Sequence, residues 1–61
     1  MTKERLVQIA ERNLKKAQRA LLVNRERQGI TEEEINNLSD NVKYAQVVYD
    51  LIVHHYIEEE L

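Results

Sequence analysis

This chain of 61 residues contains one glycine and no proline, and this scarcity of helix breakers is the strongest constraint on its fold. Glycine and proline are the residues that most disfavour the interior of a helix. With Gly29 alone, one break between two long helices is expected. The sequence therefore predicts an all-α protein with a helix over about 3–28, a turn over 29–31 and a second helix over about 32–60.

Local capping signals agree with this division. Thr2 precedes the first run of helix formers and can act as its N-cap. Thr31 followed by Glu34 has the spacing of a capping box, in which the threonine hydroxyl accepts from the backbone N–H of residue 34 and the glutamate reaches back. Gly29 fits the left-handed residue after a helix, and Ile30 supplies the apolar contact of a Schellman turn.

Apolar residues recur at alternating steps of three and four in both halves of the chain, which is the spacing of one helix face. The first half has Val7, Ala10, Leu14, Ala17 and Leu21 in this pattern, and the second has Ile35, Leu38, Val42, Ala45, Tyr49, Ile52 and Tyr56. A short connection makes neighbouring helices antiparallel. The expected architecture is an antiparallel two-helix hairpin, with these two faces in contact.

The second helix carries more apolar side chains than one neighbouring helix can cover. Those outside the contact face include Tyr44, Val47, Val48, Leu51 and Ile57, and the first helix adds Ile9, Leu22 and Val23. A chain of this length has a thin core, and a large exposed apolar patch usually marks an interaction surface. We therefore expect a homodimer that forms a four-helix bundle, with Tyr44, Val47, Val48, Leu51 and Ile57 at the interface.

Charge is divided unevenly about Gly29. Eight basic and three acidic residues precede it, whereas eight acidic residues and one lysine follow it, so a net +5 and a net −7 combine to the overall −2. Complementary pairing of the two helices explains this distribution. A second interpretation takes Arg5, Arg12, Lys16 and Arg19 as one outward basic face that contacts the backbone of RNA or DNA.

That second interpretation is supported by a resemblance. The chain resembles the plasmid repressor-of-primer family in its length, in its single glycine between two helical segments and in its alternation of small and large core residues. Its members are small hairpins that dimerise into a four-helix bundle and hold paired RNA loops on their first helices. The resemblance implies an RNA- or DNA-binding adaptor that uses the basic face.

A third interpretation starts from Leu38-Ser39 and from Asp50-Leu51-Ile52 with Tyr56. These residues resemble the sporulation aspartyl-phosphate phosphatases, short hairpins with a serine and a leucine-aspartate pair on the second helix. In that family the aspartate follows the serine by four residues, and Lys43 stands there in this chain. No catalytic residue is transferred from this resemblance, which implies a hairpin phosphatase or regulator acting on response regulators.

The residue content argues against catalysis and bound cofactors. The chain lacks cysteine, and Ser39, its only serine, has no histidine within helical reach. Asp50, His54 and Glu58 share a helical ridge, but i,i+4 pairing explains that spacing without a metal. We predict a non-enzymatic protein–protein interaction or regulatory module without cofactor or metal. With no apolar stretch long enough for a membrane span, we expect a cytoplasmic protein.

Overall fold

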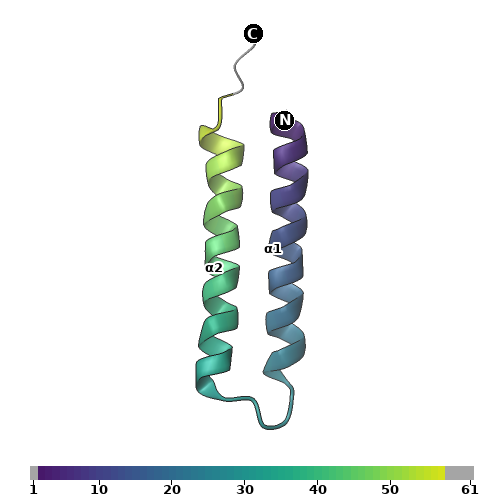
Figure 1. The fold of residues 1–61 in the computed structure, drawn as a ribbon, viewed down its shortest axis with the longest axis vertical. Helices are drawn as coiled ribbons and strands as arrows, with labels where there is room; N and C mark the ends of the chain where they lie inside the picture. The colour runs from purple at the N-terminus through teal and green to yellow at the C-terminus, as the bar shows by residue number, and fades with distance from the viewer. Residues whose placement is uncertain (1, 58–61) are drawn as a thin grey trace.

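The computed structural model describes residues 2–57 and contains two helices in this part of the chain. Helix α1 covers Lys3–Arg25 and helix α2 covers Glu32–His55. The two pack side by side in opposite directions, and with the turn and the chain ends the molecule extends about 52 Å (Figure 1). The predicted all-helical, antiparallel hairpin is therefore confirmed.

Both predicted N-caps are present. Thr2 is extended, and its hydroxyl accepts a hydrogen bond from the backbone N–H of Arg5 at 3.2 Å. Thr31 is also extended and accepts from the backbone N–H of Glu34 at 3.1 Å. The Glu34 carboxylate, however, accepts from the Arg27 guanidinium, so it ties the turn to α2 and the expected capping box has only its threonine half.

Helix α1 ends three residues earlier than the sequence predicts, at Arg25. The Asn24 side chain donates to the Ala20 carbonyl at 2.8 Å, and the Asn24 carbonyl accepts from the backbone of Arg27 at 3.1 Å, a tighter spacing than that of an α-helix. Residues 26–28 are good helix formers, but in the structure they belong to the turn that reverses the direction of the chain. Their propensity is therefore overridden by the packing of α2 against α1.

Gly29 has the predicted positive φ, at 81°, but in a different motif. Because the helix ends at Arg25, Gly29 is not its C′ residue, and the expected Schellman turn is absent. The backbone N–H of Ile30 instead donates to the Arg27 carbonyl at 3.4 Å. Gly29 is thus the third residue of a β-turn, a position that requires positive φ in the type II geometry.

A Gly29→Ala variant is expected to lower the free energy of unfolding by about 1 kcal/mol, because an L-residue is strained at positive φ. An added Cβ would meet nothing within 4 Å, so the cost is backbone strain without a clash. Thermal unfolding followed by circular dichroism measures the change. Gly29→Asn, which tolerates this φ better, should lose less than Gly29→Ala, and equal losses would contradict the argument.

Helix α2 ends at His55, and the predicted end at about residue 60 is wrong for residues 56 and 57. Tyr56 is extended, with φ −74° and ψ 125°, and its backbone N–H donates to the Leu51 carbonyl. Residues 58–60 lie outside the described part. Since α1 begins at Lys3, a longer α2 would have no neighbour, and the sequence places three glutamates where the helix dipole disfavours negative charge.

The core is as thin as the length predicts. Between residues 2 and 57 only Ala10 and Leu14 are buried, at 4% and 8% exposure, and both are on α1. The other residues of the two predicted contact faces are half-buried, except Tyr56, which lies beyond the helix and is exposed. Between Glu32 and His55, no residue is fully buried, so α2 contributes only half-covered side chains to the core.

Candidate interaction surfaces

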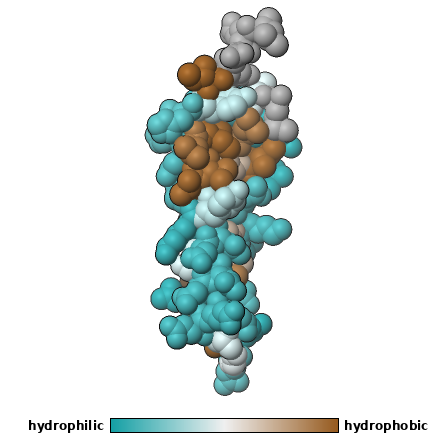
Figure 2. Space-filling model, turned by 60° about the vertical axis from the view of Figure 1, so that its left-hand side comes forward, coloured by the Kyte–Doolittle hydropathy of each residue, from teal (hydrophilic) through white to brown (hydrophobic). Residues whose placement is uncertain are grey.

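The outward face of α2 is apolar in the half of the helix nearest the chain termini. Val47 and Leu51 are each two residues from Tyr49, which places them about 160° around the helix from that core residue. Tyr44, Val47 and Leu51 are 74%, 55% and 52% exposed. Figure 2, which turns α2 toward the viewer, shows a continuous apolar patch over this part of the rod and polar surface over the rest.

We call Tyr44, Val47, Val48 and Leu51 the α2 seam. Its four residues lie at positions i, i+3, i+4 and i+7, so the side chains form one ridge on the helix. Val48 is half-buried at the edge of the helix contact. Ile57, the fifth predicted interface residue, is 83% exposed but follows the end of α2 by two residues, so it does not extend the helical ridge.

A smaller apolar pair lies at the other end of the molecule. Leu22 and Val23 of α1 are both more than 60% exposed near the turn. The sequence pattern places them outside the contact face, as observed. Ile9, the other α1 residue outside that face, is half-buried. Substitutions of Leu22 and Val23 can therefore serve as controls for substitutions of exposed apolar residues in the α2 seam.

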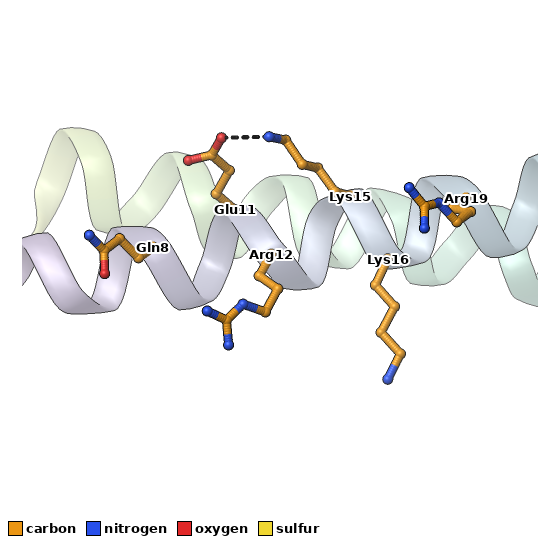
Figure 3. Close-up of a pocket in the computed structure, with 6 residues that line it drawn as sticks. All are labelled: Gln8, Glu11, Arg12, Lys15, Lys16 and Arg19. Carbon is orange, nitrogen blue, oxygen red and sulfur yellow. Dashed lines mark ion pairs between the residues drawn. The ribbon is translucent and has the colours of Figure 1, made fainter.

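The predicted basic face lies on α1, on the side opposite α2. Arg5, Arg12, Lys16 and Arg19 are all exposed. Three of them line one shallow groove along α1, together with residues that the sequence analysis did not select. We call this surface the basic groove, and its lining residues are Gln8, Glu11, Arg12, Lys15, Lys16 and Arg19 (Figure 3). Arg5 is not among them.

The side chains of the basic groove divide into two groups. Lys15 pairs with Glu11 of the preceding turn, with Nζ and Oε1 3.0 Å apart. Arg12 and Lys16 extend away from that pair on the other side of α1 (Figure 3). The i,i+4 spacing of Glu11 and Lys15 is the sequence signal that identifies their pairing. The four cations and one carboxylate give the groove a net charge of +3.

The residues of the phosphatase resemblance lie along α2 without forming a common cluster. Ser39 is half-buried and Asp50 is exposed, and their separation of eleven positions corresponds to about 16 Å along a helix. The Asp50 carboxylate accepts from the Gln46 side chain at 3.0 Å. The phosphatase interpretation stays a hypothesis, and release of phosphate from a receiver domain, with Asp50→Ala as control, would test it.

Within residues 2–57, no three histidine or acidic side chains lie together in a way that could hold a metal ion. The sequence places Asp50, His54 and Glu58 on one helical ridge. Asp50 and His54 lie in the part of the chain that the structure describes, and Glu58 lies outside it. None of the helices in this part of the chain is long and apolar enough to cross a membrane. The chemical features that the structure describes are thus the apolar α2 seam and the basic groove.

The protein is thus a helical hairpin with an exposed apolar surface on α2 and an exposed basic surface on α1. Comparison of the chain with protein-family models, with curated proteins and with solved structures finds no significant match. A functional assignment therefore depends on the surfaces themselves.

Proposed function

We propose that this protein is a non-enzymatic interaction module that self-associates through the α2 seam. Two copies would pack their seams together and form a dimer of four helices. The module would act by surface contact, as a small regulatory or adaptor protein, without catalysis and without a cofactor.

The observation that carries this proposal is the distribution of exposure along α2. Its core-facing residues are only half covered by α1, while three large apolar residues of the seam are more than half exposed. Covering apolar surface stabilises a protein by about 25 cal/mol for each Å² removed from water. A second helix layer would cover the seam and at the same time increase the burial of the residues beneath it.

A second copy is the simplest partner for such a surface. The same patch is present on every molecule, and closed two-fold contacts are the commonest assembly of identical chains. Bundles of four helices also supply the core that two short helices lack. The apolar area on this face is continuous in Figure 2, so one contact would cover it.

Sedimentation velocity over a wide concentration series tests the proposal. A monomer has a mass of 7.3 kDa, and the expected result is a concentration-dependent shift to twice that mass. The helical content should rise with concentration as well, because association and folding are coupled in so small a chain. A species that stays at 7.3 kDa and remains folded at all concentrations would overturn self-association.

The basic groove favours a second function, binding of an RNA or DNA backbone. Arg12, Lys16 and Arg19 are exposed, line the same groove and lie on the side of α1 away from α2. Cations in such a row release counterions when they contact phosphates, which favours binding at low salt. The three aromatic residues of the chain are all on the second half, at Tyr44, Tyr49 and Tyr56, so base stacking on α1 is not available.

If the groove binds nucleic acid, an Arg12→Gln, Lys16→Gln variant should reduce the slope of log affinity against log salt by about two, one for each lost phosphate contact. Gel shifts with a structured RNA at several salt concentrations measure this slope. Lys3→Gln, Arg25→Gln removes the same charge outside the groove and should change it less. Absence of any shift at low salt would overturn the nucleic-acid function.

A further inference from the structure

We propose that the dimer carries its two basic grooves on opposite faces and therefore bridges two nucleic acid duplexes, one bound in each groove. This inference rests on the proposed self-association and on the proposed nucleic-acid binding, and it adds how the two are combined. The α2 seam and the basic groove lie on opposite sides of the hairpin. This arrangement has the same result whichever way the two α2 helices run.

The α2 seam lies on the side of α2 opposite α1. Tyr49 belongs to the half-buried core face of α2, and Val47 and Leu51 precede and follow it by two residues. Helix geometry places these two side chains about 160° from Tyr49, one on each side. The middle of this exposed aliphatic pair is thus directly opposite the core. A second copy packed on the pair extends the line that runs from α1 through α2.

The basic groove has the same relation to the core of α1. Leu14 is buried, and Arg12 and Lys16 precede and follow it by two residues. Both cationic side chains are exposed, and by the same helix geometry they lie on the side of α1 opposite Leu14. Each hairpin therefore has its apolar contact on one side and these cations on the other, with both helices between them.

In a dimer formed through the seams, the four helices lie in the order α1, α2, α2 and α1. Packed helices have their axes about 8 to 10 Å apart, so three such steps separate the two α1 axes by about 24 to 30 Å. The two basic grooves are on the outer sides of this layer and face in opposite directions. A duplex in one groove is therefore separated from the other groove by the whole thickness of the dimer.

Wrapping one duplex around the dimer is disfavoured by bending and by charge. Bending energy rises with the square of the angle, and contact with both outer sides requires a turn of about 180°, against the roughly 40 to 90° of common protein-induced bends. The duplex would also pass α2, where five acidic residues and one lysine, all exposed, give a net charge of −4. Such a surface repels phosphates, so each groove is expected to bind its own duplex.

The chemistry of the groove favours paired nucleic acid over single strands. Arg12, Lys16 and Arg19 offer positive charge, and a duplex presents phosphates at twice the density of one strand along its axis. No aromatic residue precedes Tyr44, so α1 has no side chain on which unpaired bases could stack. RNA and DNA duplexes share this phosphate chemistry, so both serve as probes.

Co-capture of two duplexes tests the proposal. One short RNA duplex carries biotin and a second carries a fluorophore, and a DNA pair of the same sequence is run in parallel at low salt. The parent chain should retain the fluorescent duplex on streptavidin beads, and should retain less at large protein excess, when every duplex has its own dimer. Native mass spectrometry should give two duplexes per dimer. One duplex per dimer would overturn bridging and leave self-association and nucleic-acid binding standing.

Dimers of mixed chains give a quantitative readout. The Arg12→Gln, Lys16→Gln variant keeps the α2 seam, so it pairs with the parent chain. In an equal mixture about a quarter of the dimers have two intact grooves, so co-capture should fall to about a quarter while about three quarters of the dimers still bind a duplex. Lys3→Gln, Arg25→Gln removes the same charge outside the groove and should leave co-capture nearly unchanged. A fall no steeper than that of simple binding contradicts bridging.

A Val47→Ser, Leu51→Ser variant separates the ways in which the proposal could fail. At concentrations where it is a folded monomer, it should bind a single duplex with nearly parental affinity and lose co-capture, because each duplex contacts one groove. Much weaker binding of a single duplex by this folded monomer would show that two grooves clamp one nucleic acid. A parent chain that stays monomeric overturns self-association, and absence of binding at low salt overturns the nucleic-acid function. Bridging is wrong in all three cases, and the mixed-chain measurement does not depend on the folding of this variant.

Discussion

A Leu14→Ala variant is expected to lose about 2 to 4 kcal/mol of free energy of unfolding, the largest effect of any single substitution that we predict. Leu14 is one of two buried residues among residues 2–57, at 8% exposure. Truncation removes its transfer free energy and leaves a cavity between two helices that have few other buried contacts. Because small domains have only a few kcal/mol in reserve, much of the population is expected to unfold.

Urea unfolding followed by circular dichroism, repeated at several protein concentrations, measures this loss. Leu22→Ala is the matched control, since it makes the same chemical change on the same helix at a residue that is 62% exposed. Its effect should stay within about 0.5 kcal/mol. Equal losses for the two variants would show that Leu14 is not the centre of the core.

A Val47→Ser, Leu51→Ser variant is expected to weaken self-association about hundredfold. Each substitution replaces an exposed apolar side chain of the α2 seam with a polar one. Truncating residues at the centre of a contact costs about 1 to 2 kcal/mol each, and every 1.4 kcal/mol is tenfold in the dissociation constant. Sedimentation of the parent and the variant at matched concentrations gives the two constants.

The chain contains its own control for this experiment. Leu22→Ser, Val23→Ser removes one leucine and one valine from the exposed apolar pair on α1, with the same cost in helix propensity. It should leave the dissociation constant nearly unchanged. If this control weakens association as much as the seam variant does, the contact lies on α1 or the effect is a general loss of helix.

Features that depend on neighbouring residues were predictable from the sequence. Thr2 and Thr31 cap the two helices because a hydroxyl and a backbone N–H three residues away are always close in that geometry. Gly29 takes a positive φ for a similarly local reason. The alternating apolar spacing likewise identifies the residues of both helices that face each other, and only Tyr56 departs from it.

The candidate surfaces were predictable in part. Arg12, Lys16 and Arg19 line one groove as their spacing indicates, but Arg5 is separate and Lys15 joins them in an ion pair with Glu11. Helix geometry relates residues three or four apart reliably, whereas the shape of a groove depends on how each long side chain turns. Arg5 lies on the same face as Arg12 but about two turns nearer the start of α1, past the end of the groove.

The sequence by itself determined that the chain forms two helices, where each begins and which apolar residues are in excess, because capping and periodicity act over one or two turns. Only the tertiary structure decided that α1 stops at Arg25 and α2 at His55. Helix α1 stops because the residues after Arg25 form the turn that reverses the chain. Helix α2 stops because a helix of marginal stability persists only where a neighbouring helix covers it. Both conditions join residues that are distant along the chain.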